Sequence, residues 1–203
     1  MKIICIGRNY VDHIEELKNE RPLEPVIFLK PDSAILRKNR PFFIPSFSND
    51  LHHEVELVLR IDRLGKNIAN KFASRYYNSV GLGIDFTARD LQNKLKEKGL
   101  PWEKAKAFDN SAVISDIFVP LAELNAANID FRLDINGQTR QKGNSAQMIF
   151  PFDELVEHVS KYFTLKTGDL IYTGTPAGVS AVQINDRLEG YIGDQKMFDF
   201  MVK

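Results

Sequence analysis

Two glutamates separated by one residue lie inside an apolar stretch of this sequence, at residues 51–59. The stretch reads Leu-His-His-Glu-Val-Glu-Leu-Val-Leu, and its aliphatic and β-branched residues are typical of a strand. Successive side chains of a strand point to opposite faces, so we expect Glu54 and Glu56 to share one face. Two carboxylates about 4 Å apart repel by about 4 kcal/mol at an effective dielectric of about 20. A proton or a cation must offset this repulsion.

A hard divalent cation can offset it with oxygen ligands alone. Mg²⁺, Mn²⁺ and Ca²⁺ prefer such ligands, and Mg²⁺ keeps coordination positions open for water or substrate. Two glutamates on the solvent-exposed face of an amphipathic edge strand would have the same E-x-E spacing. A further ligand is therefore needed to favour a metal site over an exposed strand face. Asp85 is the candidate, because it follows the apolar run of residues 80–84 and would lie exposed at a strand end. A simple turn aspartate is the alternative.

A histidine and a glutamate lie three residues apart in a stretch that predicts a helix over residues 10–17. Apolar residues recur there at helical spacing, and Asn9 is a suitable N-cap. His13 and Glu16 are then neighbours on the helix surface. A carboxylate beside an imidazole raises its basicity and orients it, as a general base for water activation requires. An exposed pair without any function would have the same spacing.

A second helix is expected over residues 88–98. Thr87 is a suitable N-cap, and Asp90 lies at the capping-box position. Arg89 and Gln92 fall one turn apart on the same face of this helix and can reach the same pocket.

Lys106 and a glycine-rich loop are further candidates for holding an anion. Lys106 lies between small residues and before an aromatic one, where an ammonium can be partly desolvated and pair with a substrate anion. Residues 168–179 predict a strand that runs into a tight glycine-proline loop, whose amides and the hydroxyls of Thr173 and Thr175 can cradle a carboxylate or an oxyanion. The loop lacks the G-x-G-x-x-G order of a dinucleotide fingerprint, which excludes a Rossmann site.

Length and composition predict one domain over residues 1–203, without repeats or linkers. The 27 basic and 27 acidic residues give a net charge of zero, so no overall basic field exists to hold nucleic acid or an anionic membrane. Small-molecule partners are therefore favoured. Cys5 is the single cysteine, and the sequence shows no signal peptide and no long apolar run. A reducing cytoplasm is the expected location.

The remaining elements are mostly strands. Asn136-Gly137 follows an alternating apolar and polar run from Phe131, which predicts a hairpin. Residues 151–163 predict an amphipathic helix, and residues 187–192 and 196–202 predict a closing pair of strands.

In this order the motifs resemble the fumarylacetoacetate hydrolase family across nearly the whole chain. The resemblance is closest to its short, single-domain members that act as acylpyruvate hydrolases and oxaloacetate decarboxylases. It implies a mixed α+β, mainly β fold, a β-roll or barrel with a few peripheral helices, assembled as a homodimer. The matching motifs are Gly7-Arg8-Asn9-Tyr10 with His13 and Glu16, His53-Glu54-Val55-Glu56-Leu57, Asp85-Phe86-Thr87-Ala88-Arg89-Asp90 with Gln92, Leu100-Pro101-Trp102 with Lys106, and Gly168-Asp169 followed by Thr173-Gly174-Thr175-Pro176.

The resemblance also implies a metal site. Glu54, Glu56 and Asp85 would bind Mg²⁺ or Mn²⁺, with the other coordination positions left to water and to the carboxylate and 2-keto oxygens of a 2-keto acid. The metal would act as a Lewis acid and stabilise the enolate of pyruvate, which forms whether the broken bond leads to an acyl group or to carbon dioxide.

Roles for the polar residues follow from the same resemblance. The His13–Glu16 dyad would activate the water of hydrolysis, on a helical lid at about residues 8–25 that closes over the ligand. Lys106 would stabilise negative charge, together with the substrate-binding residues Arg89 and Gln92. Thr175 and the amides of its loop would hold the substrate carboxylate.

We therefore expect divalent-metal-dependent hydrolysis of the carbon–carbon bond of acylpyruvates (2,4-diketo acids) to pyruvate and a carboxylic acid, with oxaloacetate decarboxylation as an additional activity. One alternative is an isomerase or decarboxylase of unsaturated 2-hydroxy or 2-keto diacids from aromatic catabolism. Another is a non-catalytic homologue that binds a metal or a carboxylate.

Overall fold

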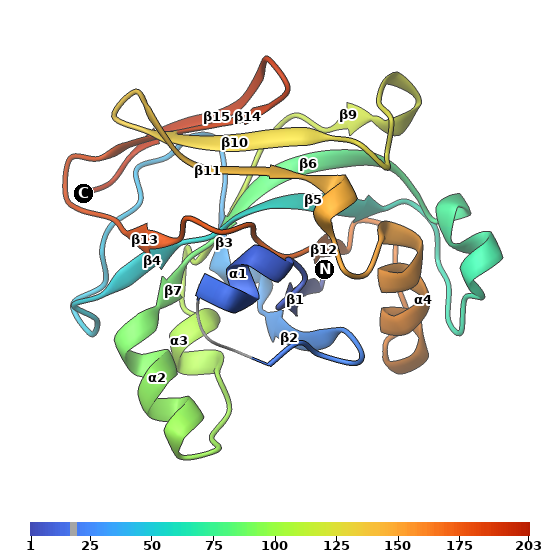
Figure 1. Cartoon of the computed structure of the whole chain (residues 1–203), viewed down its shortest axis with the longest axis horizontal. Helices are drawn as coiled ribbons and strands as arrows, with labels where there is room; N and C mark the ends of the chain where they lie inside the picture. Colours follow the sequence, from blue (N-terminus) through green and yellow to red (C-terminus); the bar gives the residue numbers. More distant parts are fainter. Residues whose placement is uncertain (17–19) are drawn as a thin grey trace.

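This computed structural model describes residues 1–16 and 20–203. Within them, most strands belong to three β-sheets. Figure 1 shows the second sheet lying over two long strands, β5 and β6, of the largest one. The largest sheet comprises β1 (Ile3–Gly7), β2 (Val26–Lys30), β3 (Ile35–Leu36), β5 (Val55–Ile61), β6 (Tyr77–Asp85), β8 (Ala112–Ile114), β9 (Val119–Pro120) and β12 (Leu170–Tyr172). The second comprises β10 (Asp130–Ile135), β11 (Gln138–Asn144), β14 (Arg187–Ile192) and β15 (Gln195–Met201), and a small third sheet comprises β4 (Leu51–His53), β7 (Thr87–Ala88) and β13 (Ser180–Ala181).

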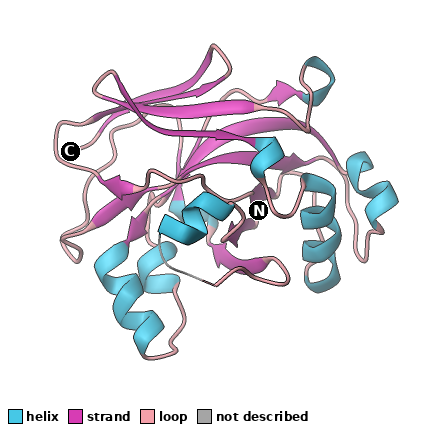
Figure 2. Ribbon diagram, in the orientation of Figure 1, coloured by secondary structure: helices cyan, strands magenta, loops and turns pink. Residues whose placement is uncertain are grey.

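Short helices lie around these sheets (Figure 2). Within the described residues, no helix is long and apolar enough to span a membrane. The α-helices are α1 (Val11–Glu16), α2 (Arg89–Glu97), α3 (Glu103–Lys106) and α4 (Phe152–Tyr162), and the 3₁₀-helices are η1 (Asp32–Ala34), η2 (Asn70–Arg75), η3 (Leu121–Glu123) and η4 (Ser145–Gln147).

The fold confirms the mixed, mainly β class expected from the sequence. The central strand β5 is buried on both faces except at Arg60, so its sequence is a nearly continuous apolar run. The second sheet packs one face on the core, because buried and more exposed residues alternate along β10. Its hairpin with β11 has the predicted Asn136-Gly137 turn, with φ angles of 52° and 76°. The predicted closing strands and the predicted amphipathic helix correspond to β14, β15 and α4.

The expected single strand over residues 51–59 is interrupted at Glu54. The chain leaves the small sheet after β4 and enters the largest sheet at Val55. Its antiparallel neighbour makes the reverse passage between β6 and β7, so the two stretches change sheets side by side. The amide N of Asp85 donates to the carbonyl O of Glu54 at 2.8 Å. This shared corner brings carboxylates from two chain segments to one point.

Helices α1 and α2 lie where helices were predicted, at residues 10–17 and 88–98. Helix α1 occupies most of the predicted stretch, but residues 17–19, which fall in the predicted helix and in the lid expected at about 8–25, lie outside the described residues. The predicted cap of α2 is wrong. Ala88, which has no side-chain acceptor, is the N-cap. The Thr87 hydroxyl instead accepts a hydrogen bond from Lys106 Nζ (2.6 Å) and donates to the carbonyl O of Asp85 (3.3 Å). Asp90 accepts hydrogen bonds from Ser48 Oγ and the Asn49 amide instead of completing a capping box.

Candidate active site

A small, mostly polar cavity, partly open to solvent, lies where α1, α2 and α3 approach the corner between the sheets. All the predicted site residues line it except Glu16, and it also contains residues that the sequence did not single out. Its lining comprises Ile6, Gly7, Arg8, His13, Phe28, Glu54, Glu56, Asp85, Arg89, Gln92, Lys96, Trp102, Lys106 and Thr175.

Three buried carboxylates meet at the floor of the cavity. Glu54, Glu56 and Asp85 each offer an oxygen within 4.8 Å of the others. Burial raises the pKa of Glu56 well above its usual range, and the negative charges of Asp85 and Glu54 raise it further. Burial also disfavours the Glu54 carboxylate, but the positive charges of Lys106 and Arg89 outweigh it and hold the pKa of Glu54 well below its usual range.

Two buried lysines compensate part of this negative charge. Lys106 Nζ donates to Glu54 Oε2 (2.8 Å), Asp85 Oδ2 (2.7 Å) and Thr87 Oγ1. Burial disfavours its ammonium form, but Asp85 and Glu54 outweigh burial, so the pKa of Lys106 is raised and the side chain stays protonated. Lys30 Nζ lies 2.7 Å from Asp85 Oδ1 and donates to the Ser111 hydroxyl (2.9 Å). Sequence reasoning overlooked Lys30, because a lysine before a proline at a strand end resembles a solvated turn.

The trio fits a hard divalent cation. Although Lys30 Nζ is close, its direction of approach makes no hydrogen bond to Asp85 Oδ1, and this buried oxygen has no hydrogen-bond partner among the described residues. Glu56 Oε2 accepts a single backbone bond, from the Gly174 amide at 2.7 Å, and an unpaired buried carboxylate is costly. Converging carboxylate oxygens of this kind are the ligand type that Mg²⁺ and Mn²⁺ take.

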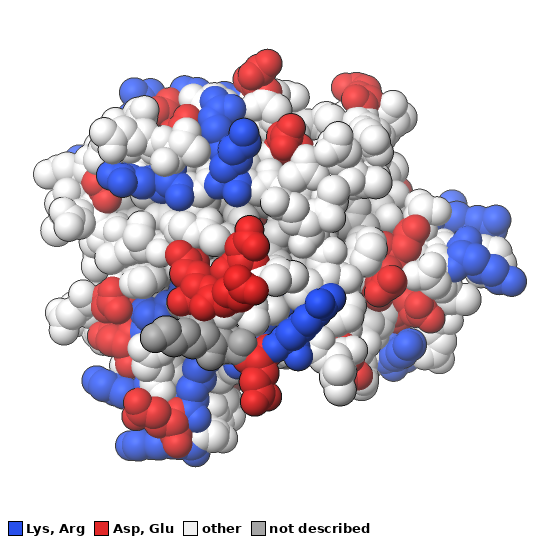
Figure 3. Space-filling model, viewed as in Figure 1, with Lys and Arg blue, Asp and Glu red and all other residues white. Residues whose placement is uncertain are grey.

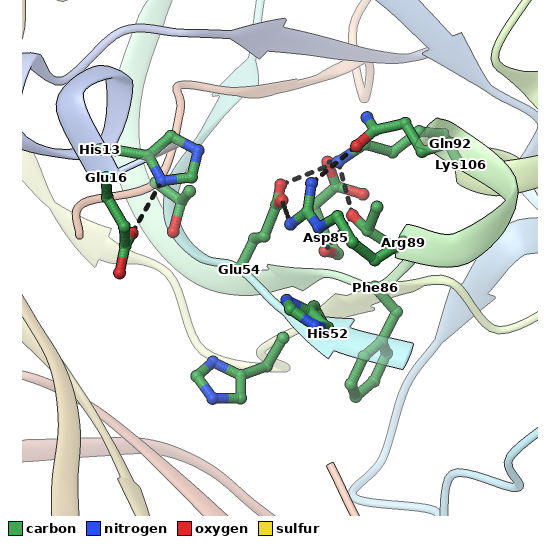
Figure 4. A network of polar contacts seen from close by, with 12 residues as sticks. His13, Glu16, His52, Glu54, Asp85, Phe86, Arg89, Gln92 and Lys106 are labelled. Atoms are coloured by element: carbon green, nitrogen blue, oxygen red, sulfur yellow. Dashed lines mark hydrogen bonds and ion pairs between the residues drawn. The ribbon is translucent and has the colours of Figure 1, made fainter. Parts of the chain in front are cut away.

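The imidazole of His13 lies across the cavity from Lys106 (Figure 4). His13 Nδ1 lies 3.4 Å from Glu16 Oε2, a long contact in which the carboxylate can only accept, so Nδ1 carries the proton. Burial lowers the pKa of His13, although Glu54 and Glu16 oppose it. The imidazole is therefore neutral at pH 7 with Nε2 unprotonated, as a general base requires. Figure 3 shows acidic side chains over α1, whose outer residues include Asp12 and Glu15, whereas His13 is buried.

The inward face of α2 is polar. Arg89 and Gln92 are its buried residues, and Arg89 Nη1 donates to Gln92 Oε1 at 2.6 Å. Arg89 Nη2 also donates to Glu54 Oε1. The predicted one-turn spacing thus places both side chains on the cavity wall, where the rigid guanidinium is held at two points.

The glycine-rich loop binds the protein's own carboxylates, which differs from the expected role of its amides. The Gly174 amide donates to Glu56, and the Gly178 amide donates to Glu16 Oε1 (3.1 Å) and Oε2 (3.2 Å). Gly174 has a φ of +100°, and a Cβ there would lie 2.7 Å from Asn9 Cβ, so only glycine fits. The loop therefore positions one carboxylate of the trio and the glutamate of the dyad.

A buried hydrogen-bond chain orients the hydroxyl of Thr175. Gln141 Nε2 donates to Thr175 Oγ1 (2.8 Å), so the hydroxyl proton remains available to donate into the cavity. Gln141 Oε1 accepts from the Val55 amide (2.9 Å) and from His53 Nδ1 (2.8 Å). His53 Nε2 then accepts from the hydroxyl of Ser180 at 2.8 Å. Sequence reasoning missed Gln141, since a glutamine in a polar hairpin strand shows no periodic signal.

Comparison with known proteins agrees with this geometry and fold. The family model for the fumarylacetoacetate (FAA) hydrolase C-terminal region matches residues 2–198. The chain belongs to the fumarylacetoacetate hydrolase family. Oxaloacetate tautomerase YcgM of Escherichia coli (strain K12) is 42% identical over 189 residues, which cover 92% of this chain and 86% of that protein.

Solved structures of the fumarylacetoacetate hydrolase family superpose on nearly the whole chain. Fumarylpyruvate hydrolase from Pseudomonas aeruginosa, in complex with Mn²⁺ and pyruvate, has a TM-score of 0.93 and 34% identity, and the match covers 100% of this chain and 89% of that one. The 5-carboxymethyl-2-hydroxymuconate delta-isomerase from Mycobacterium smegmatis has a TM-score of 0.86 and 32% identity, covering 99% and 78%. Members of the family therefore include a tautomerase, a hydrolase and an isomerase.

Proposed function

We propose that this protein is a divalent-metal-dependent enzyme of 2-keto acids that interconverts the keto and enol forms of oxaloacetate. One observation carries the proposal: a neutral, buried imidazole and three converging carboxylates line the same small cavity. The tautomerase name of the Escherichia coli relative supports the choice of oxaloacetate.

Glu54, Glu56 and Asp85 would hold Mg²⁺ or Mn²⁺, and the Mn²⁺ and pyruvate of the Pseudomonas aeruginosa relative support this assignment. When bound, the cation supplies Lewis acidity that stabilises the enolate form of a 2-keto acid. Lys106 adds a fixed positive charge beside the trio, because its ammonium is held by two of the three carboxylates.

His13 is the candidate general base. Its neutral ring has Nε2 free to take a proton from the carbon next to the keto group and to return it in the reverse direction. Glu16, held by the Gly178 amide, fixes the tautomer that makes this possible. Proton transfer of this kind typically contributes about 10²- to 10⁴-fold to a rate.

Arg89, Gln92 and Thr175 would orient the substrate. The guanidinium of Arg89 is fixed by Glu54 and Gln92, and the hydroxyl of Thr175 is left as a donor by Gln141. Such preorganised donors stabilise a substrate carboxylate without reorganising during the reaction.

Hydrolysis of acylpyruvates, the first expectation from the sequence, is the second candidate. It needs a water activated beside the distal carbonyl, and the contact between His13 and Glu16 supports such a dyad. The name of the fumarylpyruvate hydrolase relative points the same way. Oxaloacetate decarboxylation needs the enolate but no such water, and isomerisation of unsaturated diacids also relies on proton transfer.

The experiment compares three reactions of the purified protein, namely ketonisation of enol-oxaloacetate, hydrolysis of acetylpyruvate and decarboxylation of oxaloacetate. Each is corrected for its uncatalysed background. Every reaction is run with Mg²⁺, with Mn²⁺ and after EDTA treatment. We expect metal-dependent ketonisation to be the fastest. Glu56→Gln should abolish it, whereas Glu97→Gln, on the exposed side of α2, should not change it. Ketonisation at the background rate beside rapid acetylpyruvate hydrolysis would instead support the second candidate.

We also propose that the protein acts as a homodimer in the cytoplasm. The dimer follows from the family resemblance, and the cytoplasm suits a chain whose one cysteine, Cys5, is free and buried. Sedimentation of the purified protein measures the first directly.

A further inference from the structure

Two cations at the rim of the cavity are not used by the candidate chemistry. Arg8 follows β1, and Lys96 lies in the last turn of α2; both side chains line the cavity and are half-buried. Within residues 1–16 and 20–203, neither has a carboxylate within 4.0 Å. The three residues outside this range carry no carboxylate in their sequence.

The other cations that line the cavity, Lys106 and Arg89, are already paired with carboxylates of the trio. Lys30, behind the lining, pairs with Asp85. Arg8 and Lys96 are therefore surplus positive charge, and they lie nearer to solvent than the buried trio does. A pair of cations without a counterion repels, and an anion between them relieves that repulsion.

Lys96 lies in a partly buried environment in which other positive charges are close. Burial lowers the pKa of Lys96, and the positive charges of Arg89, Arg8 and Lys106 lower it further, to about 8. The negative charge of Glu54 opposes the shift but does not cancel it. Lys96 also lies 5.6 Å from the ring centroid of Trp102, so the indole limits where the ammonium can go.

We propose that Arg8 and Lys96 form a second carboxylate subsite, which binds the distal carboxylate of the substrate and sets the preference of this cavity for diacids over monoacids. The inference rests on the proposed function, in which the first carboxylate and the keto group lie at the carboxylate trio. The distal carboxylate of a four-carbon diacid then points toward the rim. There, the planar guanidinium of Arg8 can donate hydrogen bonds to that carboxylate, and the ammonium of Lys96 provides a compact positive charge beside it.

The test uses two unreactive probes that differ only by the distal carboxylate. L-malate carries it, and L-lactate is the same 2-hydroxy acid without it. Binding of each to the full-length protein is measured by calorimetry at saturating Mg²⁺, for the wild type, Arg8→Gln and Lys96→Gln. Lys94→Gln, an exposed lysine on the same helix, is the matched control.

We expect the wild type to bind malate more tightly than lactate. Each variant should weaken malate binding about tenfold and leave lactate binding unchanged, since a charge-assisted hydrogen bond contributes about this much. Lys94→Gln should leave both unchanged, and Lys96→Arg should retain most of the preference. If Arg8→Gln does not fold, Lys96→Gln alone carries the test, because Lys96 is in the last turn of α2, where glutamine is a good helix former.

Two outcomes overturn the inference: equal binding of malate and lactate by the wild type, or a malate preference that survives in Lys96→Gln. Failure of the proposed function is separate from these outcomes. A wild type that prefers malate through Arg8 and Lys96 but does not ketonise oxaloacetate would support the subsite and refute the tautomerase assignment. A protein that ketonises oxaloacetate without any malate preference would support the tautomerase assignment and refute the subsite.

Discussion

Replacing His53 with glutamine should remove a defined part of the pH dependence of stability. His53 has no exposed surface, and its two ring nitrogens bond Gln141 and Ser180. Burial lowers its pKa from 6.5 to about 4, although the hydrogen bond to Gln141 opposes the shift. A glutamine side chain can also form hydrogen bonds at this position, but it does not titrate.

The sign and size follow from these two pKa values. Above about pH 6.5 His53 is neutral in both the folded and the unfolded protein, so its titration takes nothing from the free energy of unfolding. Between about pH 6.5 and 4 the unfolded chain binds a proton that the folded protein excludes, so the free energy of unfolding decreases as the pH falls. A difference of about 2.5 pKa units corresponds to about 3 kcal/mol, which is lost once the pH has passed through about 4.

Urea denaturation at a fixed protein concentration, at several pH values from about 7 to 4, measures this directly. The difference in unfolding free energy between the wild type and His53→Gln should change by about 3 kcal/mol over this range, since the other titrating groups cancel in the comparison. Parallel curves for His53→Gln and the wild type would show that His53 is not held neutral, and the reasoning would be refuted.

Further predictions concern the site itself. Lys106→Met should lower kcat by about 10²-fold or more, measured by steady-state kinetics, because it removes the cation that two carboxylates hold; activity near the wild-type level would contradict this. His13→Gln should slow acetylpyruvate hydrolysis far more than oxaloacetate decarboxylation, and equal losses in a side-by-side assay would mean that the dyad has another role. Thr175→Val should raise KM for oxaloacetate about tenfold with a smaller change in kcat; an unchanged KM would exclude its hydroxyl from substrate binding. Saturating Mg²⁺ at about 100 times its Kd should stabilise the protein by about 2.7 kcal/mol, and calorimetry of Glu56→Gln should show no such gain.

Local patterns in the sequence identified candidates for the site, and the family resemblance grouped them. The E-x-E pair and Asp85 each end or begin an apolar run, and helical spacing placed Arg89 beside Gln92. These patterns depend on residues within a few positions of one another, which periodicity can detect.

The corner at Glu54 could not be predicted in this way. Residues 51–59 are uniformly apolar apart from the histidines and glutamates, so nothing in their period indicates where the strand changes sheets. Pairing of β4 with β7 and β13 determines that point, and these partners lie far away in the sequence. Tertiary context of this kind overrides local propensity.

The supporting residues were missed for the same reason. Gln141 reaches Thr175 from a strand 34 positions away, and Lys30 reaches Asp85 from β2. Arg8 belongs to the Gly7–Tyr10 motif and Lys96 to the helix predicted over residues 88–98, but only the folded cavity brings them to one rim. The role of each depends on burial and on distant partners, neither of which the sequence displays.

The most direct test of the central claim is a crystal structure of the protein grown with Mn²⁺ and pyruvate, using the anomalous signal of manganese. We expect one strong anomalous peak between the carboxylates of Glu54, Glu56 and Asp85, with pyruvate against it and facing His13. A manganese peak elsewhere, or a trio closed by Lys30 and Lys106 without metal at saturating Mn²⁺, would contradict the claim.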